Sequence, residues 1–455
     1  MSHILNFILS VFFSAYAILY YDFYTTNPVD LISFFVYTNE IPPITYSFFI
    51  IIKFLIIFAF LFSYIDYFYP LFLYKTFKSK FKIGLSKYRA YTALGGCSIF
   101  FIFLIHQVVV LKSIFEKTDI YDHLKTEVPS ENAPLKKNLI LIIVESLENT
   151  YSNDRLFKQN LIPQLSAFPS LGDYRQVVGT GNTAAAMTGI LCGTPTTARL
   201  QSFLLTKVTP AFEKLTCISD ILKNNGYQNY FYTSDTMKFA SKETFLKKHS
   251  FDELKGAEDL LRSDEDKGFP MFNGAADSRL FEFAYEKIAS EPKKKPFFMI
   301  LLTLNMHEPK GFLEKSCRFG KNDFTDIIRC TDKQLTEFVD KIKSLPVYKD
   351  TVIVIVGDHT ARPNPVFSTL KKEPNRTLFN AVINASTPGE KRIFSPLDMG
   401  PTLLSLIGFG DNIKIGLGSS LFTPEHNLLE IKGLDDLNKE LMKYSEKYNA
   451  LLYEK

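Results

Sequence analysis

Two continuous apolar runs, at residues 138–144 and 351–356, constrain the fold of this chain more than any other feature. Runs of this length without alternating polar residues are typical of strands that are buried on both faces of a parallel sheet. The first run is followed by Glu145, and the second by a glycine and then by Asp358 and His359. Because ligands collect at the carboxyl ends of strands in open α/β sheets, we expect these three side chains to share one site.

Strand and helix patterns alternate along the chain after residue 137. Apart from the two runs above, the pattern predicts strands at 228–233 and 296–304, helices from about residue 183, around 241–249 and around 331–344, a further element at 396–407 and a charged amphipathic helix at 434–452. This alternation predicts an α/β domain with a mainly parallel sheet between helix layers. We place this domain at 138–425 and a C-terminal helical tail at 426–455.

A glycine-rich turn at residues 179–183 leads into a run of small residues, which is typical of a turn that opens a helix. The Thr183 hydroxyl then lies near a helix N-terminus, where backbone N–H groups and the helix dipole favour an anion such as phosphate. With Glu145, Asp358 and His359 it makes a set of four ligands that suits zinc or manganese. A divalent cation lowers the pKa of a bound hydroxyl and makes it a nucleophile. For each acidic residue alone, a helix cap or a solvated loop is the alternative.

The first quarter of the chain holds three long apolar stretches, at residues 5–21, 44–74 and 91–111. Each can reach the roughly 20 residues that are needed to span a bilayer. No basic segment or small-residue cleavage site marks the first stretch as a signal peptide, so we interpret it as an anchor. We therefore expect a membrane module of about three helices at 1–112, followed by a polar linker at 113–137.

Charges in the loops predict the orientation of this module. In the loop after the first span the charged residues are all acidic, namely Asp22, Asp30 and Glu40. The loop between the second and third spans carries Lys75, Lys78, Lys80, Lys82, Lys87 and Arg89. Basic loops stay in the cytoplasm, so three spans place everything after about residue 112 outside. If the stretch 44–74 crossed twice, the large domain would be cytoplasmic, but this stretch is too short for two crossings and a turn.

Four of the five cysteines lie in the large domain, and Cys97 lies in the third apolar stretch. An even number in an exported domain suggests two disulfides, and pairing Cys192 with Cys217 and Cys317 with Cys330 closes short loops. Four free buried cysteines are the alternative. The net charge of +4 is small, and we find no pattern typical of nucleic-acid binding.

The motifs at these positions resemble, in order and spacing, the sulfatase-like branch of the alkaline phosphatase superfamily. The motifs are VESLENTY with Glu145, GTGNTAAAMTGILCGTP with Thr183, LTLNMHEP with His307 and VGDHT with Asp358 and His359. Within this branch the chain looks most like membrane-anchored phosphoglycerol transferases and lipoteichoic acid synthases. The resemblance covers about residues 138–410 and implies an alkaline-phosphatase-like domain behind the membrane module.

The resemblance implies that Thr183 takes phosphoglycerol from phosphatidylglycerol, releases diacylglycerol and passes the group to a glycan or polymer hydroxyl. It places one divalent ion, Mn²⁺ or Zn²⁺ with Mg²⁺ as a further candidate, on the four ligands named above. It also implies that His307 contacts the substrate phosphate and that Lys242 and Asp235 contact the headgroup. Lipoteichoic acid synthases have arginine, preceded by an aromatic residue, where this chain has Lys242 preceded by Ser241, and lysine holds phosphate with less geometric control. A backbone-bonded core histidine and a solvated helix face are the alternatives for His307 and Lys242.

Residues beside the predicted nucleophile distinguish between the related classes of enzyme. Asn182 and Thr180 are candidates to donate hydrogen bonds to the phosphoryl oxygens, although ordinary turn residues have the same pattern. Sulfatases proper carry a Cys/Ser-x-Pro-x-Arg motif that is absent at Thr183, so sulfate-ester hydrolysis is disfavoured. Phosphoethanolamine transferases tend to carry more cysteines and a different threonine context.

Three other functions stay open from the sequence. They are phosphoethanolamine transfer to lipid A or a glycan, a membrane-anchored phosphodiesterase or phosphatase that uses water, and a membrane sensor without catalysis. For the favoured function we expect a multi-pass protein of the bacterial inner membrane with its catalytic domain on the periplasmic or extracellular side.

Overall fold

The computed structural model describes residues 116–128, 137–196, 214–237, 242–270, 273–290, 295–317, 319–321 and 323–453. The three expected membrane spans lie outside these residues. Within them, no helix is both long enough and apolar enough to cross a bilayer.

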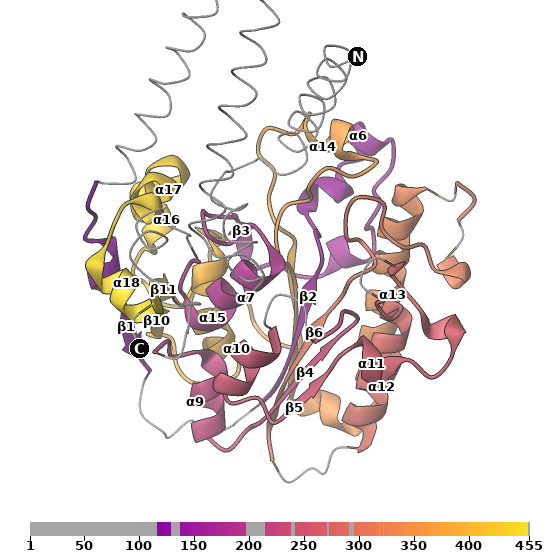
Figure 1. The fold of residues 1–455 in the computed structure, drawn as a ribbon, viewed down its shortest axis with the longest axis horizontal. Helices are drawn as coiled ribbons and strands as arrows, with labels where there is room; N and C mark the ends of the chain where they lie inside the picture. The colour runs from indigo at the N-terminus through magenta and orange to yellow at the C-terminus, as the bar shows by residue number, and fades with distance from the viewer. Residues whose placement is uncertain are drawn as a thin grey trace, which may run out of the picture.

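A sheet of six strands forms the centre of the domain (Figure 1). In spatial order the strands are β5 (Glu253–Lys255), β4 (Gln228–Thr233), β6 (Phe297–Leu302), β2 (Asn138–Val144), β7 (Thr351–Gly357) and β8 (Asn380–Ile383). The first five strands are parallel, and β8 is antiparallel to β7. The predicted α/β fold is confirmed, and the sheet is mixed because its edge strand β8 runs against its neighbour.

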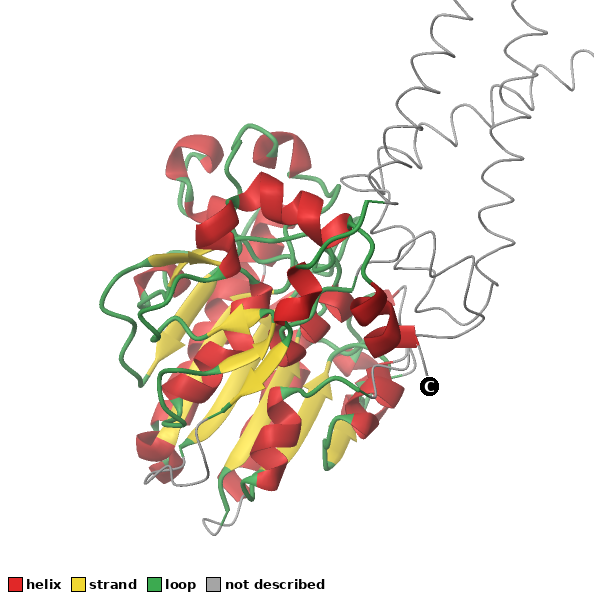
Figure 2. Ribbon diagram, turned by 90° about the vertical axis from the view of Figure 1, so that its left-hand side faces the viewer, coloured by secondary structure: helices red, strands yellow, loops and turns green. Residues whose placement is uncertain are grey.

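Helices cover both faces of this sheet. These helices include α7 (Thr183–Cys192), α9 (Ile218–Asn224), α10 (Lys242–Lys248), α12 (Asp277–Ser290), α13 (Phe324–Lys343) and α15 (Pro396–Leu406). Odd-numbered side chains of β2 enter one core cluster with α7, α9 and α15, and even-numbered ones enter a second cluster with α12 and α13. Figure 2 shows the strands between these helix layers. Both faces of β2 are therefore buried, which explains why its sequence shows no alternation.

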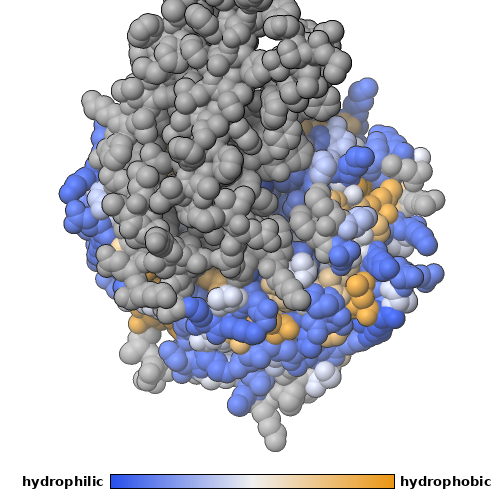
Figure 3. Space-filling model, in the orientation of Figure 1, coloured by the Kyte–Doolittle hydropathy of each residue, from blue (hydrophilic) through white to orange (hydrophobic). Residues whose placement is uncertain are grey.

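The remaining elements are short. They are β1 (Lys125–Glu127), β3 (Gly172–Tyr174), β9 (Arg392–Phe394), β10 (Lys414–Gly416), β11 (Gly418–Ser419), α6 (Asp154–Phe157), α11 (Ala257–Leu260), α14 (Phe367–Leu370) and α16 (Leu428–Lys432), with 3-10 turns at Ile120–His123, Asn149–Ser152, Leu165–Ala167, Asp264–Asp266, Lys315–Cys317 and Pro346–Asp350. Among the described residues, only three large apolar side chains are exposed, those of Phe319, Ile393 and Ile431. The part of this surface that is visible in Figure 3 is correspondingly mostly hydrophilic.

Two helices differ from the sequence-based expectation. α13 begins at Phe324 rather than around residue 331, because the Asp323 side chain accepts hydrogen bonds from the first backbone N–H groups of the helix. The single helix expected at 434–452 is two helices, α17 (Leu434–Met442) and α18 (Glu446–Tyr453). Between them Tyr444 pairs with the backbone of residues 116–118, and this long-range contact ends the first helix.

Parts of the expected linker and tail belong to the main core. Ile120 and Tyr121 from the linker region lie in the same buried cluster as the odd-numbered face of β2. Leu437 and Tyr448 from the tail lie in it too, and the rings of Tyr121 and Tyr448 are 4.4 Å apart. These contacts pack both ends of the described chain against one domain.

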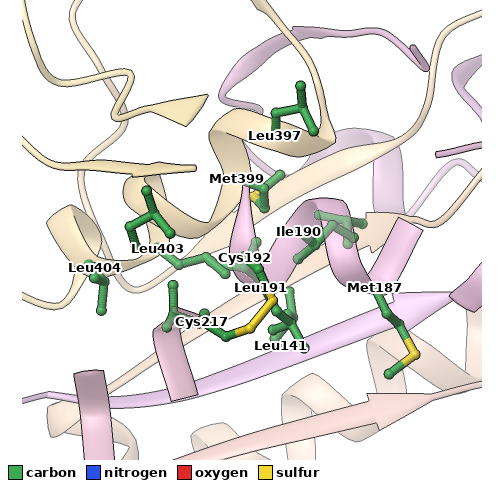
Figure 4. Close-up of a cluster of buried hydrophobic side chains, with 14 of the residues drawn as sticks. Leu141, Met187, Ile190, Leu191, Cys192, Cys217, Leu397, Met399, Leu403 and Leu404 are labelled. Atoms are coloured by element: carbon green, nitrogen blue, oxygen red, sulfur yellow. A yellow bond between two sulfur atoms is a disulfide. The ribbon is translucent and has the colours of Figure 1, made fainter. Parts of the chain in front are cut away.

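Two disulfides join the helices to their surroundings. One links Cys192, the last residue of α7, to Cys217, the N-cap of α9, and the other links Cys317 to Cys330 in α13. This is the pairing expected from the sequence. In Figure 4 the Cys192–Cys217 bond lies among Leu141, Leu191 and other apolar side chains. It therefore links the helix that begins with Thr183 to the start of α9.

We predict that replacing both Cys192 and Cys217 by serine lowers the unfolding free energy by about 3 kcal/mol, since the bridge restricts the unfolded chain. Scanning calorimetry of the full-length chain in detergent measures this change. Cys97→Ser is the control, because it leaves both disulfides intact. An unchanged melting temperature of the double variant would contradict the prediction.

Candidate metal centre

The two strands that lead to the predicted ligands lie side by side. β2 and β7 pair in parallel register with Val144 opposite Gly357, so Glu145 and Asp358 leave the same edge of the sheet. The candidate ligand atoms of Glu145, Asp358 and His359 all lie within 4.8 Å of one another, and the three side chains are buried. The structure therefore brings together the three residues that the strand ends predicted.

The turn after β2 holds two of these ligands in place. Ser146 adopts a positive φ of 53°, its N–H donates to Asp358 Oδ1 at 2.8 Å, and its hydroxyl donates to Glu145 Oε1 at 2.7 Å. A Cβ at Gly357 would lie 1.8 Å from the carbonyl oxygen of Leu147, so only glycine lets β7 pass this turn. Backbone shape thus orients both carboxylates.

Unused ligand atoms converge at the centre. Asp358 Oδ1 accepts two N–H hydrogen bonds, whereas Oδ2 has no hydrogen-bond partner among the described residues. His359 Nδ1 is 3.1 Å from the carbonyl oxygen of Thr360, so Nδ1 carries the proton and Nε2 presents its lone pair. Nε2 lies 3.4 Å from Glu145 Oε1 and 3.5 Å from Asp358 Oδ2. A cation between these atoms would bind the free Asp358 Oδ2 and His359 Nε2 together with Glu145, whose Oε1 also accepts from Ser146.

Electrostatics agree with this geometry. Burial raises the pKa of Glu145 well above its usual range, and the neighbouring Asp358 carboxylate adds to that rise. Burial also lowers the pKa of His359. Both shifts reflect charges that are removed from water, and a divalent ion supplies the missing opposite charge. The residues present therefore fit one divalent metal ion.

Thr183 lies at the rim of the same centre. It is the first residue of α7, it is partly exposed, and its hydroxyl is 3.3 Å from Glu145 Oε2. Asn182 caps this helix, because its side-chain oxygen accepts from the N–H of Ala185 at 2.9 Å. The Thr180 hydroxyl donates to a backbone carbonyl at 2.8 Å. The structure thus brings the fourth predicted ligand to the centre and uses its two neighbours to shape the turn.

The predicted substrate residues each contact other protein groups. His307 follows β6, and its Nδ1 is 2.7 Å from the carbonyl oxygen of Glu308. Lys242 begins α10 and forms a buried ion pair with Asp235. Burial lowers the pKa of Lys242, while the carboxylates of Asp235 and, at longer range, Glu145 favour its charged form. Asp235 therefore already balances the positive charge of Lys242, for which the resemblance implies a contact with the headgroup.

Arg362 and Glu308 lie near the candidate ligand Glu145 and were not predicted from the sequence. Arg362 donates to the carbonyl oxygen of Gly181 at 2.5 Å and lies 3.4 Å from Glu308 Oε1. Burial favours the neutral form of Glu308, but the positive charges of His307 and Arg362 outweigh it and lower the pKa of this carboxyl. Arg362 therefore adds a cation beside the turn that holds Thr183. The one signal in the sequence was its place three residues after His359.

Asp277 supports the segment that leads to His307. It is buried at the start of α12, where it accepts from the Ser234 hydroxyl at 2.6 Å and from the N–H groups of Leu304 and Asn305 at 2.9 and 3.0 Å. Burial raises the pKa of Asp277 to about 7. These bonds tie the ends of β4 and β6 together.

A second group of candidate ligands has a structural role. Cys217, Asp220 and His249 lie close together, but the Cys217 sulfur is bonded to Cys192. The Asp220 carboxylate lies 2.9 Å from His249 Nδ1 and accepts from Ser250 at 2.8 Å. This group therefore joins α9 to the end of α10.

Comparisons with known proteins agree with this geometry. A family model described as "Sulfatase" matches residues 137–409. Phosphoglycerol transferase I of Salmonella typhimurium and that of Salmonella typhi are each 35% identical over 308 residues, which cover 64% of this chain and 40% of each relative. The chain thus spans about 40% of the length of the curated relatives it matches.

Two solved structures share the fold. An alkaline phosphatase superfamily protein from Vibrio parahaemolyticus has a TM-score of 0.50 at 23% identity and covers 69% of this chain and 76% of its own. A lipoteichoic acid synthase from Listeria monocytogenes has a TM-score of 0.53 at 19% identity, covering 67% and 80%. At this identity the likeness supports the fold alone.

We predict that Ser146→Ala weakens metal binding by about ten- to a hundredfold, because Glu145 loses the hydrogen bond that orients it. Equilibrium dialysis of Mn²⁺ and Zn²⁺ against the full-length protein measures the affinity. Ser152→Ala is the matched control, since that hydroxyl donates to the carbonyl oxygen of Asn149. Equal affinities for the wild type and Ser146→Ala would contradict the proposed ligand geometry.

Asp277 predicts a pH dependence of stability. Its folded pKa of about 7 lies above the ordinary 3.8, so between these values the folded state binds more protons than the unfolded state. This group therefore makes the unfolding free energy fall as pH rises through that window. Denaturant titrations from pH 4 to 8 should show the wild type losing stability relative to Asp277→Asn up to about pH 7. A difference that does not change with pH would refute this assignment.

Proposed function

The chain belongs to the sulfatase family, and we propose that it is a membrane-anchored, metal-dependent phosphotransferase. It moves a phosphoglycerol group from phosphatidylglycerol to a hydroxyl of an extracytoplasmic glycan or polymer. The observation that carries this proposal is the Thr183 hydroxyl at a helix N-terminus, 3.3 Å from Glu145 in the candidate metal centre. The names of the Salmonella relatives supply the phosphoglycerol group.

Thr183 is the nucleophile of the first step. Its Oγ bonds to phosphorus while the bond from phosphorus to the diacylglycerol oxygen breaks, and the Thr183 proton ends on the released diacylglycerol. In the second step the acceptor oxygen bonds to phosphorus while the bond from phosphorus to Thr183 Oγ breaks, and the acceptor proton ends on the freed Thr183 oxygen. When bound by Glu145, Thr183, Asp358 and His359, a divalent ion lowers the pKa of the threonine hydroxyl and neutralises phosphate charge. Mn²⁺, Zn²⁺ and Mg²⁺ are the candidates.

The protein's own groups position the phosphate. Thr183 is the first residue of α7, and the N-terminus of a helix favours a bound anion such as phosphate. Arg362 lies beside the nucleophile turn, and His307 follows a strand that ends at the same edge of the sheet. Lys242, together with Asp235, contributes to the walls of the headgroup site. Phosphoryl transfer depends mainly on such positioning and on electrostatic stabilisation.

The proposed location follows from the sequence. Anchors in residues 1–112 keep the domain at 138–425 beside its lipid donor, with the linker at 113–137 between them and the helical tail at 426–455 behind it. A tether raises the effective concentration of a substrate that does not leave the membrane. The enzyme then acts at the outer face of the bacterial inner membrane.

The test uses phosphatidylglycerol that is labelled in the headgroup or in the acyl chains, incubated with full-length protein in detergent and Mn²⁺. We expect diacylglycerol release and headgroup label on the wild-type protein. Thr183→Ala should lower release by roughly a thousandfold or more, because the attacking oxygen is lost. Thr188→Ala is the control, since this hydroxyl, one turn further along α7, donates to the carbonyl oxygen of Ala184 at 3.1 Å.

The outcomes separate the alternatives. Cleavage of phosphatidylethanolamine in place of phosphatidylglycerol would identify a phosphoethanolamine transferase. Release of free glycerol phosphate without transfer to an added glycan would identify a hydrolase. Equal activity of the wild type and Thr183→Ala would refute the proposed nucleophile.

A further inference from the structure

Glu308 is a buried acidic residue within the site that the reaction described above does not use. It follows His307 directly and is only 7% exposed. Its Oε1 lies 3.4 Å from Arg362, whose other nitrogen donates to Gly181, two residues before Thr183. Glu308 therefore lies beside the nucleophile turn, one residue after the predicted phosphate-binding histidine.

The second carboxylate oxygen of Glu308 is unused. Among the described residues, Oε2 has no hydrogen-bond partner. His307 Nδ1 is 4.0 Å from Oε2, beyond hydrogen-bond distance, and that nitrogen lies 2.7 Å from the carbonyl oxygen of Glu308. A buried carboxylate oxygen without a partner costs free energy, so such an atom in a binding site points to a donor on the ligand.

The chemistry of the oxygen limits what that donor is. A phosphate group presents only acceptors and negative charge, so Glu308 repels it. The part of the substrate that faces Glu308 must instead carry an O–H or N–H group. A glycerol headgroup offers two hydroxyls, and an ethanolamine headgroup offers an ammonium group.

We propose that Glu308 forms a headgroup subsite, in which Oε2 accepts a hydrogen bond from a hydroxyl of the glycerol that stays attached to the transferred phosphate. This assignment rests on the proposed function, because the phosphoglycerol group comes from it. Arg362 fixes the other oxygen of the same carboxylate and lies towards the nucleophile turn. One ion pair thus separates two subsites, with the guanidinium on the phosphate side and the free carboxylate oxygen on the polyol side.

The experiment compares three ligands that share a phosphate and differ only beyond it. The full-length protein in detergent, loaded with Mn²⁺, is titrated by calorimetry with glycerol 1-phosphate, ethyl phosphate and phosphoethanolamine. The wild type, Glu308→Gln and Glu308→Ala are compared. Glu286→Gln is the matched control, because Glu286 also pairs with an arginine, Arg262, but on the exposed surface.

We expect the wild type and Glu286→Gln to bind glycerol 1-phosphate about tenfold more tightly than ethyl phosphate, as a hydrogen bond to a charged group supplies. Glu308→Ala should reduce that ratio to about one. Glu308→Gln should keep most of it, because an amide oxygen still accepts from a hydroxyl. Ratios within one variant cancel any loss of folded protein or metal, which affects all three ligands alike.

Two results would overturn the proposal. One is a ratio that Glu308→Ala leaves unchanged. The other is tightest binding of phosphoethanolamine that both Glu308 variants abolish equally, which would mean that the carboxylate binds an ammonium group. The lipid-release assay is independent of these titrations. If the wild type releases no diacylglycerol but the ligand ratios hold, the transferase function fails and the polyol subsite stands; if release occurs and the ratios are equal, the subsite alone fails.

Discussion

The parallel pairing of β2 with β7 is the contact on which the rest of the structure depends. Its register sets Glu145 beside Asp358 and His359, and these three groups are held away from water. Removing a charged side chain from water costs several kcal/mol even after relaxation. The strands themselves offset this cost, because each fully buried aliphatic side chain contributes roughly 1.5–3 kcal/mol and β2 is buried at every position. The burial of the apolar strands therefore offsets the free-energy cost of the buried charged residues at their ends.

A second layer of charge supports the loop that holds the ligands. Arg376 donates to both oxygens of Glu148 and to the carbonyl oxygen of Ala361, and the N–H of Ala361 donates back to Glu148. Glu148 is fully buried, so this pair is shielded from solvent and from salt. Two sets of contacts thus join the loop after Asp358 to the turn after Glu145. One is the hydrogen bond from Ser146 to Asp358, and the other joins Ala361 to Glu148 and Arg376. Two segments that are far apart in sequence behave as one support for the candidate ion.

The candidate ligands could be predicted from the sequence because strand ends are local signals. Glu145, Asp358 and Thr183 each follow a pattern that can be seen within about ten residues, and parallel pairing then brings them together. Asn182 shows the limit of such signals, because the same sequence pattern fits a residue that caps the helix and a residue that donates to phosphate. Glu308 and Arg362 were missed because their contact joins loops after different strands. The break at Tyr444 was missed for the same reason, as it depends on pairing with residues 116–118.

The packing of α7 links stability to chemistry. The helix begins at Thr183 and ends at Cys192, which is bonded to Cys217. A Cβ at Gly400 in α15 would lie 2.6 Å from the carbonyl oxygen of Ile190, so the two helices approach more closely than any larger residue permits. This contact and the disulfide restrict sliding and rotation of α7, and its first residue keeps a fixed position against Glu145. Since phosphoryl transfer depends on near-attack geometry, the close packing that holds the helix also sets the position of the Thr183 oxygen, which we propose as the nucleophile.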